Sequence, residues 1–408
     1  MMKTIMKVSV LLLVLFAGLS CSTAKVIGQS TTGKTIVYSL DLSALEKNRS
    51  AIQNKEAAIM PAYKTLLKDA DKALQFEPVS VMSKTNNPPS GDKHDYMSLA
   101  PYFWPDPKKA DGLPYIRKDG QTNPEVKDYK DKEYMPKLCE QVNVLAMAYY
   151  FSGDNTYAEH AAKLMRVWFL DPATKMNPNL KYAQAIKGVN DGRGAGLIDS
   201  RHFVKLIDAI GLLQTSKSWK AEDQKGMQQW FADFLNWMQT SKTGIDELNA
   251  KNNHGAWYDA QRLSMALFTG NTELAKKIAA NAAARLDYQV DENGFLPKEM
   301  ERTISLHYSA FALEAFFNIA NMADKAGFDL WNYTTPTGKS LKKSFTALKP
   351  YFANEKKWEG EQIKDYEFED GYLLLFEAAK RYNCKDCEQA VKTLAADKAP
   401  RLRINLLY

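Results

Sequence analysis

A long series of helical segments constrains this sequence more than any other feature. Apolar residues recur at intervals of three and four, the spacing that places them on one face of a helix. No stretch alternates apolar and polar residues with the turn spacing of strands, so a sheet domain of any size is not expected. The predicted helices cover 51–75, 138–151, 155–170, 200–214, 221–239, 255–268, 272–289, 306–326, 339–352, 370–381 and 387–395.

Short polar turns, such as Gly-Asp-Asn at 153–155 and Thr-Gly-Asn at 269–271, join these helices into hairpins. Hairpins that fill most of a 408-residue chain either close into a ring or form an open solenoid. No repeat of fixed length with a shared signature occurs, which favours an all-α fold of the α/α toroid type. In such a ring, 255–268 and 306–326 would be successive inner helices whose N-termini lie at the same rim.

The first 21 residues have the parts of a bacterial export signal. Two lysines precede an apolar run, and small residues then lead to Cys21. A cysteine at this place predicts a lipoprotein signal over 1–20 with a lipid anchor on Cys21; plain cleavage nearby is the alternative. We expect 21–50 to be a tether and 51–408 a single domain. The predicted location is the periplasm or the outer membrane.

Composition narrows the possible partners. The formal charge of +6 includes Lys3 and Lys7, which leave with the signal, so the chain is only mildly basic. That charge is compatible with an acidic polymer. Nucleic acid is a poor candidate, because no run of Lys and Arg and no patterned basic helix occurs. No other long apolar run follows the signal, so the membrane is expected only through Cys21. We expect a monomer.

Three cysteines follow Cys21, namely Cys139, Cys384 and Cys387. A single C-x-x-C without a second pair or nearby histidines is a poor zinc motif. In an exported protein, a local disulfide between Cys384 and Cys387 is expected instead. The histidines outside the motifs below show no metal spacing, so neither a metal nor a cofactor is predicted.

Two polar clusters stand at predicted helix starts. The first is Lys251–Tyr258, with the sequence KNNHGAWY, and the second is Glu299–Tyr308, with the sequence EMERTISLHY. Each meets the positive end of a helix dipole, where an anion is favoured. Amide, imidazole, guanidinium and phenol groups gathered there predict a site for a carboxylate. Each side chain alone also has a structural interpretation, as a helix cap or a packed ring.

The Asn-Asn-His run, followed downstream by an Arg and a Tyr, resembles the alginate lyases with an α/α toroid fold. The resemblance covers most of the chain from about 96 to 381. It implies that Asn253 and His254 bind and neutralise a uronate carboxylate, with His254 as a possible second base. It also implies that Tyr308 is the main catalytic base and acid, while Arg302 holds the carboxylate or lowers the Tyr308 pKa.

These residue types suit β-elimination from a polyuronate. The C5 proton is removed while the C4 oxygen leaves, and hydrogen bonds to the carboxylate stabilise the developing enolate. A tyrosine, with an unperturbed pKa of about 10, becomes a usable base near cationic groups. Arg302 and Tyr308 would point apart on one continuous helix. Arg302 is therefore expected in a loop before a helix capped by Thr303 or Ser305.

Other side chains are expected to bind the sugar chain. The segment 88–126 holds seven of the sixteen prolines and an aromatic run, which predicts a long surface loop. It resembles the aromatic loop of the family. Arg193 lies between glycines that permit close backbone approach near the substrate. His307 has the alternative of facing the adjacent helix as a hydrogen-bonded imidazole. The predicted substrate-binding residues are Tyr102, Trp104, Asn190, Arg193, Trp257, Tyr258 and His307.

The leading hypothesis is a polysaccharide lyase that cleaves alginate or a related β-1,4-linked polyuronate such as glucuronan, without metal. One alternative is a glycoside hydrolase on the same toroid, which needs two carboxylates. Only Glu299 and Glu301 lie close by in the sequence. The other alternative is a non-catalytic, glycan-binding surface lipoprotein. The acidic segment 365–370 would repel a polyanion and is expected on the outside.

Overall fold

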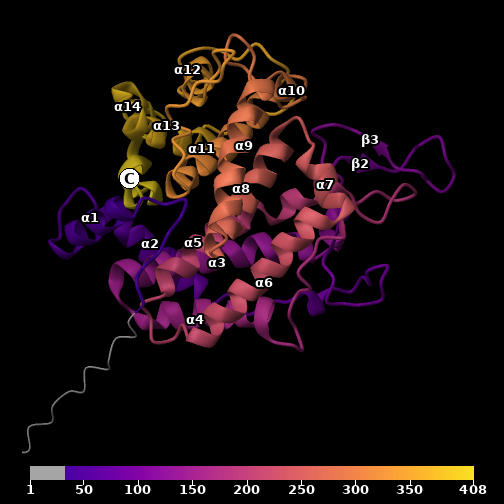
Figure 1. Ribbon diagram of the computed structural model, residues 1–408, viewed down its shortest axis with the longest axis horizontal. Helices are drawn as coiled ribbons and strands as arrows, with labels where there is room; N and C mark the ends of the chain where they lie inside the picture. The colour runs from indigo at the N-terminus through magenta and orange to yellow at the C-terminus, as the bar shows by residue number, and fades with distance from the viewer. Residues whose placement is uncertain (1–32) are drawn as a thin grey trace, which may run out of the picture.

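The computed structural model describes residues 33–408 and shows the predicted α/α toroid (Figure 1). The predicted signal, the anchor on Cys21 and the first part of the tether lie outside the described residues. Successive inner helices pack side by side around a central cavity. They are α3 (Asp131–Ser152), α5 (Phe203–Leu213), α8 (Asn253–Phe268), α11 (Ser305–Lys325) and α13 (Glu369–Arg381).

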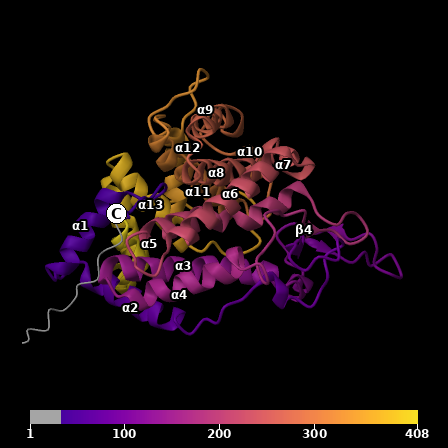
Figure 2. The same cartoon turned by 60° about the horizontal axis from the view of Figure 1, so that its bottom comes forward.

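Outer helices pack against this ring as the partners of helical hairpins, as α4 does beside α3 in Figure 2. They are α2 (Met60–Ala73), α4 (Asn155–Met165), α6 (Ala221–Thr240), α9 (Thr272–Gln289), α12 (Leu341–Phe352) and α14 (Lys385–Ala395). Only α9 and the short α10 (Pro297–Met300) separate α8 from α11 along the chain. The prediction that α8 and α11 are successive inner helices is therefore confirmed.

The predicted boundary between tether and domain at residue 51 is wrong. A helix, α1 (Leu42–Gln53), occupies the end of the predicted tether. The Asp41 side chain caps it by accepting from the backbone N–H of Ser43 at 2.9 Å. Leu45 and Ile52 pack into the core, which makes α1 part of the domain. The helix expected over 51–75 begins only at Met60, followed by a proline in the first turn.

A buried carboxylate fastens the chain before α1 to the inner ring. Asp208 of α5 accepts hydrogen bonds from the backbone N–H of Tyr38 at 2.6 Å, Ser39 at 3.0 Å and Leu40 at 3.1 Å. The Asn48 side chain on α1 donates to carbonyl oxygens near the C-terminal end of the chain, those of Asn405 and Tyr408, both at 3.3 Å. The N-terminal and C-terminal segments thus lie together.

Short strands occur only beside the helical ring in the described part of the chain. β1 (Met97–Leu99) pairs in parallel with β4 (Tyr182–Ala185), and Met97 lies opposite Tyr182. β2 (Phe103–Trp104) pairs antiparallel with β3 (Ile116–Arg117), and Phe103 lies opposite Arg117. The β2–β3 hairpin belongs to the predicted proline-rich loop and projects past α7 (Lys242–Leu248) in Figure 1.

The predicted disulfide between Cys384 and Cys387 is formed, while Cys139 is free and buried. Over residues 33–408, no helix combines the length and the apolar character needed to cross a membrane.

We expect Asp208→Ala to lower the free energy of unfolding by about 3 kcal/mol. The reason is that hydrogen bonds to a charged group contribute about 1.5–3 kcal/mol each, and the change leaves buried N–H donors unpaired. Urea denaturation measures the effect. Asp233→Ala, at an exposed position of α6, is the control and should change stability by less than about 0.5 kcal/mol. Equal effects of the two changes would contradict a role for Asp208 in fastening residues 38–40.

Candidate active site

The two predicted motifs meet at a buried carboxylate. Glu299 of α10, which is 1% exposed, accepts from the Asn253 backbone N–H at 2.6 Å and from Asn253 Nδ2 at 2.7 Å. Burial raises the pKa of Glu299, whereas the bonds from Asn253 and the charges of Arg302 and His254 oppose that rise. Arg302 and His254 therefore both lie near this carboxylate, which links the residues at the starts of α8 and α11.

Asn253 itself is fully buried. Its amide nitrogen is held by Glu299, and its Oδ1 has no hydrogen-bond partner among residues 33–408. Asn252 is the N-cap of α8 and accepts from the His254 N–H at 3.3 Å. The geometry therefore gives Asn253 a structural part in fixing α8 to α10. The predicted direct contact between Asn253 and a ligand carboxylate is not supported.

His254, by contrast, is partly open to solvent. Its side chain is 21% exposed, and its Nδ1 lies 2.7 Å from Oε1 of Glu247, a buried residue of α7. Glu247 was not among the predicted site residues, because it belongs to the short helix α7, which was not predicted. It also lies near Arg193, where burial lowers the pKa of the guanidinium and the charge of Glu247 opposes that fall.

Arg302 lies in the loop before α11, as predicted, and its guanidinium stacks on the Tyr308 ring at 3.6 Å. The predicted cap by Thr303 or Ser305 is wrong, because the N-cap is Ile304, which makes no side-chain bond. Instead, residues 361 and 362 accept hydrogen bonds from the free backbone N–H groups at the start of α11. Glu361 O accepts from the backbone of Ser305 at 3.0 Å, and Gln362 Oε1 accepts from that of Leu306 at 3.1 Å.

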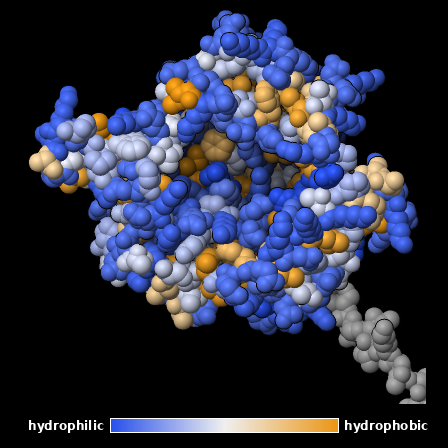
Figure 3. Space-filling model, turned by 180° about the vertical axis from the view of Figure 1, so that it is seen from behind, coloured by the Kyte–Doolittle hydropathy of each residue, from blue (hydrophilic) through white to orange (hydrophobic). Residues whose placement is uncertain are grey.

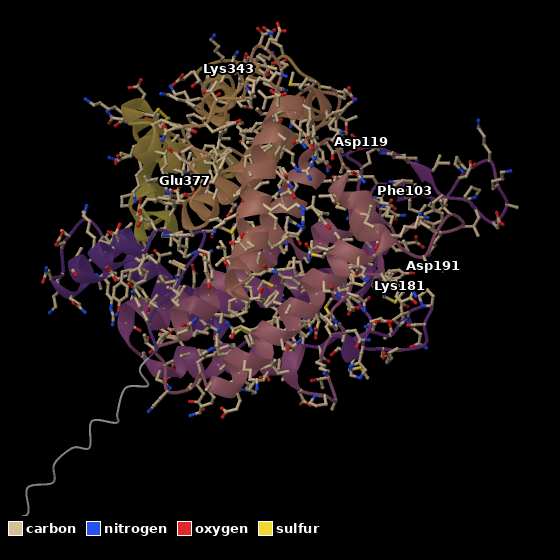
Figure 4. All side chains as sticks on the ribbon, in the orientation of Figure 1. Phe103, Asp119, Lys181, Asp191, Lys343 and Glu377 are labelled. Carbon is tan, nitrogen blue, oxygen red and sulfur yellow. A yellow bond between two sulfur atoms is a disulfide. The ribbon has the colours of Figure 1, made fainter. Side chains whose placement is uncertain are left out.

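Asp119, next to strand β3 of the hairpin, holds Arg302 in place. It accepts from Arg302 Nε at 2.9 Å and Nη2 at 2.7 Å, and Arg117 approaches it at 2.6 Å. Burial raises the pKa of Asp119, but its bonds with Arg302 and Thr303 outweigh burial and hold that pKa well below the usual range. In Figure 4, Asp119 and Phe103 lie on the same side of the molecule, away from Glu377.

The Tyr308 hydroxyl donates to the Tyr102 hydroxyl at 2.9 Å. Burial raises the pKa of Tyr308 and the Tyr102 hydroxyl adds to the rise, while Arg302 lowers it. Arg302 therefore acts in the predicted direction, but burial outweighs it. The expectation of a lowered pKa is wrong for the free protein, in which Tyr308 keeps its proton.

The remaining predicted loop residues differ in what they contact. Trp104 is partly exposed on β2, and its indole N–H donates to Gln121 O at 2.9 Å, within the hairpin. Arg193 donates to Gln184 Oε1 at 2.8 Å and lies over the Phe103 ring, and its Nε has no partner in the described residues. Asn190 closes a turn by accepting from the Ile186 N–H at 3.3 Å.

The glycines around Arg193 do permit close backbone approach, but to other protein segments. A Cβ at Gly192 would lie 2.0 Å from Lys181 O beside β4. One at Gly194 would lie 2.9 Å from Thr243 O of α7. The glycines therefore let the Arg193 segment pack between β4 and α7, which corrects the prediction that they approach substrate.

A buried polar network supports this region and was not predicted. Gln184 has a left-handed backbone, with φ of 50°, and its Nε2 donates to Asp199 at 3.1 Å. Asp199 also accepts from Tyr96 at 3.0 Å and Ser98 at 2.7 Å and pairs with Lys132. Strain in a buried residue other than glycine is typical of functional regions. No sequence spacing reveals these contacts, because most partners lie far apart in the chain.

Three predicted substrate-binding residues have structural partners. Trp257 is 3% exposed and donates to Phe311 O at 3.1 Å, and Tyr258 is 1% exposed and donates to Met238 O at 2.7 Å. Both belong to the core, because the start of α8 is covered on nearly all sides. His307 bonds through Nδ1 to Gln362 Nε2 at 2.7 Å. The imidazole of His307 is therefore hydrogen-bonded, but to a loop residue and not to the adjacent helix, and it also lines a cavity.

A cavity of about 250 Å³ lies between the inner helices beside this cluster. It is lined by Arg201, just before α5, by Lys205 of α5, by Trp257 of α8, by His307 and Glu314 of α11, and by Asp370 of α13. Asp370 therefore faces the interior, which corrects the expectation that the segment 365–370 lies wholly outside. The view from behind shows a hollow with a mainly hydrophilic rim (Figure 3). Within residues 33–408, no cluster of three or more His, Cys, Asp or Glu side chains could hold a metal ion.

The family model for alginate lyase matches residues 80–358. The chain belongs to the alginate lyase family. A crystal structure of an alginate lyase from Bacteroides ovatus is 40% identical, with a TM-score of 0.87, and the match covers 92% of this chain and 99% of that one. Alginate lyase A1-III from Sphingomonas species A1 shares the fold at 15% identity, with a TM-score of 0.53 over 86% of this chain and 89% of that one.

Curated alginate lyases match a shorter part of this family member. The one from Pseudomonas syringae pv. syringae strain B728a is 30% identical over 178 residues, which is 42% of this chain and 37% of the relative. The one from Pseudomonas aeruginosa strain LESB58 is 33% identical over 117 residues, which is 27% of this chain and 30% of the relative. The matched region thus spans about a third of the length of these curated alginate lyases.

For this alginate lyase family member, we expect Asp119→Asn to release the β2–β3 hairpin from the start of α11, because a neutral amide cannot hold the Arg302 guanidinium through two charged oxygens. Hydrogen exchange of the backbone amides in 101–121 should become at least about tenfold faster, as for a loss of about 1.4 kcal/mol.

Asp111→Asn is the matched control for that experiment. Asp111 lies at the tip of the same hairpin and accepts only from the nearby Leu113 N–H. Unchanged exchange in Asp119→Asn, or equal changes in both variants, would contradict the role of Asp119.

Proposed function

We propose that this protein cleaves alginate, or a related β-1,4-linked polyuronate such as glucuronan, by β-elimination. The observation that carries the proposal is the cluster in which Arg302 stacks on Tyr308 and Tyr308 bonds to Tyr102, with His254 and Arg302 both near the buried Glu299. This cluster offers cationic groups for a carboxylate and a phenol for proton transfer in one place. Family membership supports the same chemistry.

In this proposal, Arg302 and His254 neutralise the uronate carboxylate beside C5. The positive charge of Arg302, and that of His254 whenever its ring is protonated on both nitrogens, lets the carboxylate take up the electrons of the broken C5–H bond as an enolate. Arg193 is a further cation at the same rim, with an unpaired Nε. Asn253 acts indirectly, because Glu299 and Asn253 together fix the start of α8 that carries His254.

Tyr308 supplies the acid and, once ionised, the base. Its hydroxyl holds a proton in the free protein and donates to the Tyr102 hydroxyl at 2.9 Å. Loss of the Tyr308 proton to solvent produces the phenolate that acts as the base. An ionised Tyr308 takes the C5 proton and returns it to the departing C4 oxygen. The stacked Arg302 stabilises the phenolate during this step, because a cation near the ring favours its charged form.

A glycoside hydrolase is less consistent with the geometry. Glu299 is buried and bonded to Asn253, whereas Glu301 is largely exposed and pairs with Lys298 at 2.8 Å. These carboxylates do not face each other across an open site, as hydrolysis requires. A binding protein without activity would have no need for a phenol set between a guanidinium and a second phenol.

We also propose export as a lipoprotein anchored on Cys21 and function as a monomer in the periplasm or outer membrane. The support is the signal-like sequence of the first 21 residues.

The direct test is incubation with purified polymannuronate, polyguluronate and glucuronan. An unsaturated product forms only by elimination, and its ultraviolet absorbance should rise with at least one polymer. New reducing ends without that absorbance would indicate hydrolysis instead. No product from any of the three would contradict the proposed activity.

Tyr308→Phe should lower kcat at least about a hundredfold and leave the fold and polymer binding intact, because it removes one hydroxyl from a packed ring. Initial rates and thermal unfolding measure the two effects. Tyr333→Phe, a change at a partly buried tyrosine that makes no side-chain hydrogen bond within residues 33–408, is the control. More than about a tenth of the activity in Tyr308→Phe would exclude Tyr308 as the base.

The rate should depend on pH in the direction set by Tyr308. Burial raises its pKa above the ordinary value of 10.0, so the ionised base is a minor species at neutral pH. Below that pKa the ionised fraction grows about tenfold per pH unit, and kcat/KM should grow likewise from about pH 7 to 9. A flat profile over this range, with the protein still folded, would mean that Tyr308 does not act as the free-enzyme base.

His254→Ala should separate the two uronates. Mannuronate and guluronate differ at C5, so their protons leave from opposite faces of the ring. Tyr308 serves the face of the leaving oxygen, and His254 is the candidate base for the other face. Both polymers should be cleaved more slowly through poorer neutralisation, with a loss at least about tenfold greater for one of them. Equal losses would leave His254 as a carboxylate ligand only.

A further inference from the structure

Glu247 and His254 form a carboxylate–imidazole pair whose partners come from different helices. Glu247 lies in the last turn of α7, a short helix that was not predicted, and His254 lies in the first turn of α8. The distance from Glu247 Oε1 to His254 Nδ1 is 2.7 Å, and Glu247 is 4% exposed. In the described part of the chain, His254 is the only side chain that hydrogen-bonds to Glu247.

Arg285 of α9 holds the segment that connects these two helices in place. Its guanidinium donates to Leu248 O and to Ala250 O, both at 2.9 Å, and pairs with the buried Asp259 at 2.5 Å. Gly194 lets the neighbouring loop pack directly on α7, because a Cβ there would lie 3.1 Å from the Glu247 nitrogen. The position of the Glu247 carboxylate is therefore set by packing on two sides.

The pair dictates where the imidazole carries its hydrogen. An ionised carboxylate only accepts hydrogen bonds, so the nitrogen facing it must be the donor. We propose that Glu247 is a positioning residue that keeps the hydrogen of neutral His254 on Nδ1 and leaves the Nε2 lone pair free to meet a ligand. Nε2 makes no hydrogen bond within residues 33–408, and the side chain is partly exposed.

This assignment rests on the proposed function only for its effect on activity. If His254 is a base, it must present an unprotonated nitrogen to the sugar, and the opposite tautomer cannot do so. Where a histidine acts as a catalytic base, loss of the neighbouring carboxylate that fixes its tautomer lowers kcat by a large factor. Glu247 would then matter for kcat without touching the substrate.

The test begins with the unaltered protein without substrate. Nitrogen-15 NMR of histidine-labelled protein at pH 8, with His254→Ala used to assign the signal, should show His254 neutral and protonated on Nδ1. A ring protonated on Nε2, or on both nitrogens, would overturn the proposal. This result does not depend on which polymer is cleaved, so it fails or stands separately from the proposed function.

Glu247→Gln is the second arm. Its amide can either accept from Nδ1–H or donate to Nδ1, so the preference for Nδ1–H should weaken and part of the His254 signal should move toward the Nε2–H tautomer while the fold is kept. On the polymer that proves active, kcat should fall at least about tenfold with KM changed less than about threefold. Asp246→Asn removes the same charge from the exposed neighbour on α7 and should change neither readout. An unchanged tautomer in Glu247→Gln, or equal kinetic effects of both variants, would overturn the proposal.

Discussion

The bond between the buried Glu299 carboxylate and Asn253 is the interaction on which the site depends. It joins α10 to the first turn of α8, and α10 leads directly into the loop that carries Arg302. A buried carboxylate needs donors close by, and the backbone N–H and the amide of Asn253 supply them. As a result, His254 and Tyr308 are held at the same rim of the toroid although they are separated by α9.

Two other carboxylates near the site also hold a nitrogen-bearing side chain in place. Asp119 holds Arg302, and Glu247 holds His254. In each case, a carboxylate fixes the direction of a cationic or basic group whose other face remains for a ligand. Asp119 also offsets the positive charge of Arg302, so in the proposed function a uronate carboxylate would meet an oriented guanidinium rather than a free one. Preorganised donors of this kind need little rearrangement during reaction.

Much of this fold followed from the sequence, because helical periodicity and polar turns are local signals. They predicted the inner helices, their order and the loop position of Arg302. The missed elements were α1, α7 and α10, of which α7 and α10 are too short to show a periodic face. The residues of the candidate site were harder to predict from the sequence. Trp257 and Tyr258 share a motif with His254, yet packing buries them. Asp119, Glu247 and Gln184 gain their roles through contacts with other elements, and neither periodicity nor a motif reveals such contacts.

The most direct measurement of the account is a crystal structure of the Tyr308→Phe variant with a mannuronate tetrasaccharide bound. A uronate carboxylate should lie within about 3.2 Å of nitrogen atoms of Arg302 and His254. The adjacent C5 should face position 308 at about 3–3.5 Å from where the hydroxyl stood. An oligosaccharide seated instead in the cavity of Arg201 and Asp370, with no carboxylate near Arg302 or His254, would contradict it.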